Sequence, residues 1–286
     1  MKPGARPPFP RKPRSLAGAA LFLCCASAAG QQGGDANLPL WEAGVFGGSA
    51  STPAYPASDE RTTRSLVLPF LLYRGEVLRA DQSGIGARLL HNDAVEFDVG
   101  FALSLPARSR DVPARRGMPD LGTLVEFGPR LKVNLANPTP GSHLRLEAPL
   151  RAVIEVRGGL RREGLAFEPR LVWEQADPLG TWNLDANLGV VLGNAALNNY
   201  FYEVQPQLAT DQRSPYRARP GMLLARAGAS AWRMLGPDWR ILGFIRYDNY
   251  AIAANRDSPL FRQNTEVSAG IGFAWTWRRS QESARK

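Results

Sequence analysis

The stretch Val95-Glu96-Phe97-Asp98-Val99-Gly100-Phe101-Ala102-Leu103-Ser104-Leu105 alternates strictly between two kinds of side chain. Its odd positions are valine, phenylalanine or leucine, and its even positions are acidic or very small. Successive side chains of a β-strand point to opposite faces, so the stretch predicts a strand with one apolar and one polar face. A strand that crosses the hydrocarbon of a bilayer needs about 9–11 residues, whereas strands of soluble proteins average about 5–6. The length therefore favours a membrane-spanning strand over a soluble sandwich.

The same alternation recurs along the chain. Apolar residues occupy most odd positions of 121–135, the even positions of 144–154 and 182–190, and the odd positions of 267–277. Charged, amide or small residues stand between them, as a polar lumen would require. Tryptophans gather at the ends of these segments, as expected at a membrane interface: Trp173, Trp182, Trp239, Trp275 and Trp277. We expect strands to begin near residues 38, 64, 76, 84, 94, 120, 143, 164, 181, 221, 238 and 265.

These segments predict an all-β protein, a closed antiparallel transmembrane β-barrel of about twelve strands. Ten strands is also possible, because the third and fourth segments are short. Short turns at 74–75, 92–93, 137–141, 177–180 and 235–237 largely alternate with long connections near 49–63, 106–119, 193–220 and 252–264. Outer-membrane barrels have short periplasmic turns and long external loops, so both termini are expected on the periplasmic side. Closure removes the free sheet edges that lipid cannot solvate.

Residues 1–30 have the composition of a cleavable signal peptide, which leaves residues 31–286 as the barrel. A basic segment with no acid precedes an apolar run that ends in Cys24 and Cys25, and small residues follow it. These are the two cysteines of the chain, so the mature protein is expected to lack disulfides. Removal of five basic residues leaves 30 Lys+Arg against 26 Asp+Glu, or +4 instead of +9. Nucleic-acid binding is therefore not indicated. The expected location is the outer membrane of a Gram-negative cell, with membrane lipid as the surrounding partner.

Charged side chains of both signs fall on the predicted lumen face: Glu126, Arg130, Lys132, Arg145, Glu147, Arg151, Glu168 and Arg170. They admit two interpretations. One is an ion-pair network that plugs a narrow barrel, and the other is the lining of a selective pore. The first is favoured, and the loop 193–220 is a candidate to fold inward.

No catalytic, cofactor or metal site is indicated. His143 is adjacent to Ser142, but neighbouring residues of a strand point to opposite faces, so the pair cannot form a nucleophile–base contact by adjacency alone. His91 lies in a turn-forming sequence. No His/Cys cluster has metal-ligand spacing, and the loop carboxylates Asp35, Asp59, Glu60 and Asp257 lack the spacing of a calcium loop. A hydrolytic barrel is the least favoured of the functions considered.

Several short motifs, in a consistent order, resemble the MltA-interacting protein family, also called MipA/OmpV. The resemblance rests on Ala54–Glu60, Pro69–Gly75, Arg115–Gly122, Glu126–Pro129, Asn198–Tyr202, Tyr216–Gly221 and Asp257–Leu260. Motif residues in the predicted loops are Tyr55, Pro56, Asp120, Gly122, Tyr200, Phe201, Tyr216, Gly221, Asp257, Ser258 and Pro259. Two departures are a tail from Arg278 to Lys286 after the last aromatic residue, and Glu203 where the family has a glycine.

The resemblance implies a monomeric outer-membrane barrel that serves as a scaffold. The named family member is similar to an adaptor that joins a murein lytic transglycosylase to a bifunctional penicillin-binding protein. The resemblance supplies no role for the individual loop residues. A small-solute or ion pore is the alternative function, and conductance would distinguish the two.

Overall fold

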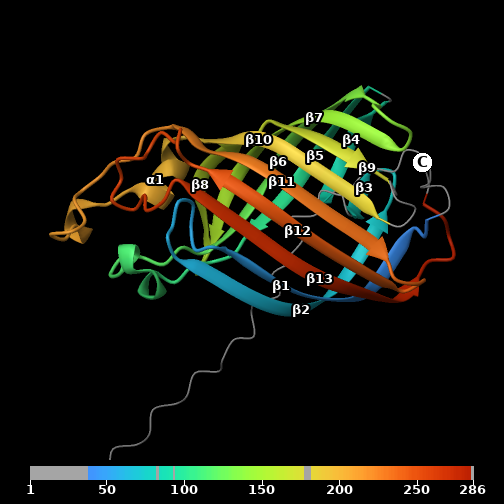
Figure 1. Cartoon of the computed structure of the whole chain (residues 1–286), viewed down its shortest axis with the longest axis horizontal. Helices are drawn as coiled ribbons and strands as arrows, with labels where there is room; N and C mark the ends of the chain where they lie inside the picture. Colours follow the sequence, from blue (N-terminus) through green and yellow to red (C-terminus); the bar gives the residue numbers. More distant parts are fainter. Residues whose placement is uncertain (1–37, 82–83, 93, 177–181, 285–286) are drawn as a thin grey trace, which may run out of the picture.

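A computed structural model describes residues 38–81, 84–92, 94–176 and 182–284. The predicted signal segment, residues 1–30, lies outside the described residues, as does the whole predicted turn at 177–180. Among the residues that are described, no helix is long and apolar enough to cross a bilayer. The chain folds into one antiparallel sheet that closes on itself, because the first strand pairs with the last (Figure 1).

The strands follow one another around the ring in sequence order. Their bounds are β1 Trp41–Pro53, β2 Arg61–Arg74, β3 Leu78–Asp81, β4 Gly84–His91, β5 Val95–Ser104, β6 Thr123–Ala136, β7 Ser142–Val156, β8 Leu160–Phe167, β9 Arg170–Gln175, β10 Asn183–Gly193, β11 Gly221–Met234, β12 Trp239–Asn249 and β13 Thr265–Arg279. A short helix, α1 (Ala195–Tyr202), lies between β10 and β11. The prediction of a closed antiparallel barrel is confirmed.

Two of these strands share one place in the ring. Both β8 and β9 pair with β7 on one side and with β10 on the other. Glu168 and Pro169 separate them, and proline has no N–H to donate to a ladder. The barrel formed by the described residues therefore has twelve strand positions, as predicted, with one position split into two strands. Because the number of strand positions is even, the chain enters the first strand and leaves the last strand at the same end of the barrel.

Burial is inverted with respect to a soluble protein. Outward side chains such as Phe101 and Ile271 are 47% and 53% exposed, whereas Glu147, inside the barrel, is 1% exposed. Large apolar residues outside and charged residues inside are the arrangement that a surrounding lipid phase requires. The interior is the lumen, and its walls carry the polar half of each alternating strand.

Some predicted boundaries were wrong. Strand β1 continues to Pro53 and β2 begins at Arg61, so the first long connection is 54–60 and not 49–63. Strand β8 begins at Leu160 and not near residue 164. Most of the added residues are small, polar or charged, because the strand extends beyond the hydrocarbon into water, where the apolar alternation is no longer needed.

The two ends of the barrel differ. Figure 1 shows α1 and the long connections at one end, and the C-terminus at the other. All the tryptophans singled out in the sequence lie toward the end with the C-terminus, where the rings of Trp239 and Trp275 stack with centroids 5.9 Å apart. From the general asymmetry of outer-membrane barrels, we infer that the end with the long loops is the external one.

Candidate functional site: a charged lumen under a packed external cap

The structure places all eight predicted lumen charges inside the barrel and joins them with partners from other strands. On β5 and β6, Arg130 contacts Asp98 at 2.6 Å and Lys132 contacts Glu96 at 2.8 Å. Asp98 also accepts from Lys132 at 3.1 Å. The pairs cross-link neighbouring strands from the inside, so this part of the wall is held by side chains as well as by its backbone ladder.

A second group of pairs lies on the next strands. Glu147 of β7 accepts from Arg145 at 2.8 Å and from Arg170 of β9 at 2.7 Å. Arg145 also bonds to Glu174, a partner that the sequence interpretation did not single out. Buried charges are tolerable only when they are paired in this way.

A third group continues the network to β11 and β12. Glu168 accepts from Arg151 at 2.9 Å and from Arg226 at 3.2 Å, and Arg226 in turn contacts Asp248 at 2.7 Å. Glu126 lies 3.5 Å from Arg151. The mixed charges are thus ion-paired along the wall from β5 to β12, which favours the ion-pair interpretation over a row of free charges along a pore.

The external loops pack together into a cap with its own hydrophobic core. The core of the described residues combines apolar side chains from all four long connections with the adjoining strand ends; from the loops and α1 it includes Tyr55, Ala57, Ala107, Val112, Met118, Leu121, Leu197, Tyr202, Val204, Ala218, Ala253 and Leu260. Leu260, Ala57 and Tyr202 are completely buried. Loops that bury a shared core are fixed in one arrangement, unlike the mobile loops usual at a surface. We call this loop assembly the cap.

Tyrosine hydroxyls connect the loops of the cap to one another. Tyr55 donates to the carbonyl of Leu260 at 2.7 Å, and Tyr202 donates to the carbonyl of Pro56 at 3.2 Å. Ser258 donates to the carbonyl of Tyr202 at 2.8 Å. Tyr216 donates to the side-chain oxygen of Asn255 at 3.1 Å. These residues of the family motifs therefore hold loop to loop.

Burial changes the protonation of the groups inside the cap. Removal from water raises the pKa of Tyr55 and of Tyr202 above the ordinary tyrosine value, because the anionic phenolate is poorly solvated there. Burial likewise lowers the pKa of the Arg115 guanidinium, which lies over the Tyr55 ring, 5.6 Å from its centroid. The phenols accordingly remain neutral hydrogen-bond donors at physiological pH.

A second junction fixes the cap to the rim of the barrel. The backbone N–H of Gly122 donates to Glu155 of β7 at 2.7 Å, and Tyr200 of α1 donates to the same carboxylate oxygen at 3.0 Å. A Cβ at position 122 would lie 2.5 Å from that oxygen, so the close approach requires glycine. Nearby, Asp120 accepts from the N–H of Ser109 at 2.7 Å.

The remaining motif residues have separate places. The ring of Phe201 packs edge-on against Tyr200, with centroids 5.1 Å apart. Gly221 has φ +143°, a conformation that L side chains rarely adopt, at the start of β11. Pro259 is half-buried between Ser258 and Leu260. Asp257 is exposed and lies 3.5 Å from Arg219. Most of the motif set therefore builds the cap, and Asp257 faces water.

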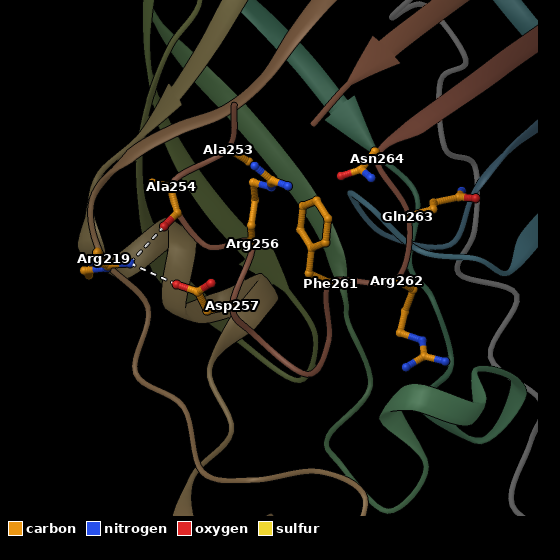
Figure 2. A pocket seen from close by; sticks show the side chains of 9 residues that line it. All are labelled: Arg219, Ala253, Ala254, Arg256, Asp257, Phe261, Arg262, Gln263 and Asn264. Atoms are coloured by element: carbon orange, nitrogen blue, oxygen red, sulfur yellow. Dashed lines mark hydrogen bonds and ion pairs between the residues drawn. The ribbon is translucent and has the colours of Figure 1, made fainter. Parts of the chain in front are cut away.

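Asp257 and Arg219 also line a polar hollow of about 600 Å³ on the cap surface. Figure 2 shows it between Arg219 on one side and the segment 253–264 on the other, with Arg256 and Phe261 near its centre. The third arginine of its lining, Arg262, is paired with Asp59 at 3.2 Å. The hollow is open and its charges are largely exposed, so it has the character of solvated loop surface.

The candidate hydrolytic pair does not assemble. Ser142 donates to the carbonyl of Thr139 at 2.8 Å, as part of the turn before β7. His143 contacts the side chain of Asn137 at 2.8 Å. Both residues are engaged in turn geometry and not with each other. Within the described ranges, no group of three or more His, Cys, Asp or Glu side chains has an arrangement that could hold a metal ion.

Several solved structures match this chain at low sequence identity. The translocator domain of the autotransporter NalP from Neisseria meningitidis is 14% identical and matches with a TM-score of 0.42 over 86% of this chain and 90% of its own. The NanC porin is 11% identical, with a TM-score of 0.40 over 82% and 98%. Outer membrane phospholipase A from Escherichia coli is 10% identical, with a TM-score of 0.36 over 82% and 92%. No curated protein sequence matches the chain.

A family model covers nearly all of the barrel. It is described as MltA-interacting protein MipA and matches residues 45–277, from β1 to β13, including all four external loops. A match over this length agrees with the resemblance found in the loop motifs. The chain therefore belongs to the MltA-interacting protein MipA family of outer-membrane β-barrels.

Proposed function

We propose that this protein is a non-conducting scaffold of the outer membrane that binds murein enzymes at its periplasmic end. The observation that carries the proposal is the cap, in which four external loops share a buried core above a lumen whose wall is lined by ion pairs. A barrel closed in this way is poorly suited to passing solutes. The turns and the C-terminal tail at the periplasmic end of the barrel remain available to protein partners.

The periplasmic end supports an ordered binding surface. The tail after β13 returns beside the segment that precedes β1, where Ala284 donates to the carbonyl of Leu38 at 2.7 Å and Leu40 donates to the carbonyl of Glu282 at 2.8 Å. The exposed Arg278 lies near the end of β13, opposite Ala43 of β1. The tail that departs from the family pattern is thus part of the surface that a periplasmic partner would meet. The family's name records an interaction with MltA. By resemblance, the partners are a murein lytic transglycosylase and a penicillin-binding protein.

The test combines binding with conductance on the purified full chain. The immobilised protein is expected to retain a purified murein lytic transglycosylase and a bifunctional penicillin-binding protein. The variant Arg278→Glu should weaken retention, while Arg256→Glu, the same charge reversal on the external cap, should not. Retention of neither enzyme would remove the scaffold proposal. Stepwise single-channel conductance in planar bilayers would instead support the alternative of a pore.

A further inference from the structure

Strand β2 is paired unequally on its two sides. Along β1 it is paired from end to end, from Trp41 opposite Tyr73 to Pro53 opposite Arg61. Along β3 only two pairs form, Tyr73 with Ala80 and Arg74 with Arg79. Strand β3 has four residues and β4 has eight, against fourteen in β2. Within the described part of the chain, residues 61–72 therefore have a strand neighbour on one side only. We call this length of unpaired edge the seam.

The sequence of β2 suits an edge position. Pro69 lies within the seam, and proline is confined to edge strands because it cannot donate to a second ladder. At the external end of the seam, the guanidinium of Arg64 donates to the carbonyl of Pro106 beyond β5. Unpaired backbone groups are costly in hydrocarbon but are tolerated where they border a water-filled lumen. The seam is thus a built feature of the wall.

Over residues 66–72 of the seam, both faces of β2 are apolar. On the outside, Val67 and Leu71 are 72% and 62% exposed. On the lumen side, Leu66, Leu68 and Phe70 are partly exposed. On strands such as β6 and β7 the lumen side carries the ion pairs. An apolar surface therefore continues from the membrane-facing side, around the edge of β2, to the inside of the barrel.

The apolar lumen surface extends from β2 over β1, β13 and β12. Phe46 on β1 and Phe244 on β12 project into the lumen with the leucines of β2, opposite glycines that leave room for the rings. A Cβ at Gly44 would lie 2.5 Å from the ring of Phe70, and one at Gly270 would lie 2.5 Å from the ring of Phe244. We call this surface the apolar lumen strip: Phe46, Leu66, Leu68, Phe70, Leu242 and Phe244. The lumen thus has an apolar strip on β1, β2 and β12, which the pairs Glu42–Arg74 and Arg246–Asp248 flank, and an ion-paired wall on β5 to β9.

We propose that the seam admits the acyl chain of a membrane amphiphile from the bilayer into the lumen, where the chain lies against the apolar lumen strip. The strip is continuous with the lipid-facing surface, so the chain need not cross water to reach it. Its polar headgroup meets the ion-paired wall on β5 and β6. The cap covers the external mouth, which makes the seam the direct route from the membrane. This binding role goes beyond the scaffold function and does not depend on it.

A polypeptide strand added along β2 is the competing occupant, because it would pair the free backbone groups. It is less favoured, since a strand in the seam would lie beside β2 and leave the apolar lumen strip uncovered. An acyl chain covers the strip itself. The strip, and not the edge alone, is therefore the feature that selects a lipid.

The test uses single-cysteine variants, since residues 31–286 contain no cysteine. Leu68→Cys reports the strip, Val67→Cys the lipid-facing side, and Asn187→Cys the lumen face of β10, away from the seam. Each is labelled with a small fluorophore and reconstituted in phosphatidylcholine vesicles with or without brominated acyl chains. We expect fluorescence loss at position 68 comparable with that at position 67, and little loss at position 187. Native gels run with and without boiling confirm that each variant is folded.

The proposal would be overturned if the fluorophore at position 68 is quenched by aqueous iodide, as at position 187, and is not quenched by brominated lipid. A polypeptide that co-purifies in intact-mass analysis and shields position 68 would overturn it as well. A second variant, Leu66→Gln with Leu68→Cys, should reduce the lipid quenching while the barrel stays folded. Retention of the murein enzymes is measured separately, so failure here is distinguishable from failure of the scaffold.

Discussion

The hydroxyl of Tyr55 donates a 2.7 Å hydrogen bond to the carbonyl of Leu260, a residue 205 positions further along the chain. The bond joins the first external loop to the last. Both residues are buried, and both belong to the motifs by which the family is recognised. A loop contact that closes the cap in this way explains why short, separated motifs carry the family resemblance: each supplies one part of a single packed structure.

Loss of this bond should loosen the cap without unfolding the barrel. In Tyr55→Phe the buried carbonyl of Leu260 loses its partner, which costs about 1–3 kcal/mol. We expect faster trypsin cleavage at Arg256 and Arg262, with an unchanged shift between boiled and unboiled samples in gels. Tyr247→Phe, on the membrane-facing side of β12, is the matched control. Equal cleavage rates for both variants and the parent protein would contradict this role of Tyr55.

Alkaline pH should open the cap. Burial raises the pKa of Tyr55 and Tyr202 in the folded protein, whereas an exposed tyrosine titrates near pH 10. Stability from a group with a raised folded pKa is fully present below the unfolded value and is lost as pH rises from about 10 toward the folded value. Trypsin sensitivity of the loops should therefore increase above about pH 10. The double variant Tyr55→Phe/Tyr202→Phe should show a smaller pH dependence, and an identical profile would refute the assignment.

The ion pairs of the lumen should contribute strongly to barrel stability. Glu147 is almost fully buried and accepts from both Arg145 and Arg170. Glu147→Gln removes the carboxylate that Arg145 and Arg170 share and leaves each guanidinium with one remaining partner, Glu174 for Arg145 and Glu168 for Arg170, at a cost of about 3–5 kcal/mol. We expect a lower urea midpoint for loss of the compact, unboiled gel band. Asp238→Asn breaks an exposed pair with Arg279 and should cost at most about 1 kcal/mol. A similar midpoint for the two variants would show that the lumen pairs are not structural.

The strand positions could be predicted because successive residues of a strand face lipid and lumen in turn. The side chains therefore alternate between apolar and polar. Val95–Leu105 shows this alternation clearly, and β5 and β13 begin at or next to the expected residues. The ends of β1 and β8 could not be predicted in this way, since the strands continue past the membrane. The apolar lumen face of β2 was also missed. Eight successive residues from Leu66 to Tyr73 are apolar or aromatic, so no alternation is left to reveal that the inside differs from the other strands.

The composition of the cap could not be derived from periodicity. Its core joins residues from four loops, and the contact between Tyr55 and Leu260 depends on the whole ring being closed. The motifs named residues that the structure packs into the cap, but their contacts could be read only from the packing. The lumen charges were found from their strand positions, whereas the partners Glu174 and Arg226 depend on the register between strands.

The junction of Gly122, Glu155 and Tyr200 yields the last prediction, because it depends on the absence of one side chain. A Cβ at position 122 would approach Oε1 of Glu155 to 2.5 Å and its Cγ to 2.6 Å, so Gly122→Ala must displace the carboxylate. Displacement breaks the hydrogen bonds from the Gly122 N–H and the Tyr200 hydroxyl together. We expect a loss of about 1–3 kcal/mol in cap stability and faster trypsin cleavage at Arg108 and Arg110. Gly243→Ala, where the nearest atom lies 3.5 Å from the added carbon, should behave like the parent protein. Both variants add one methyl group to a glycine. If the loop resists trypsin equally well in Gly122→Ala and in Gly243→Ala, Glu155 does not hold the cap to the rim.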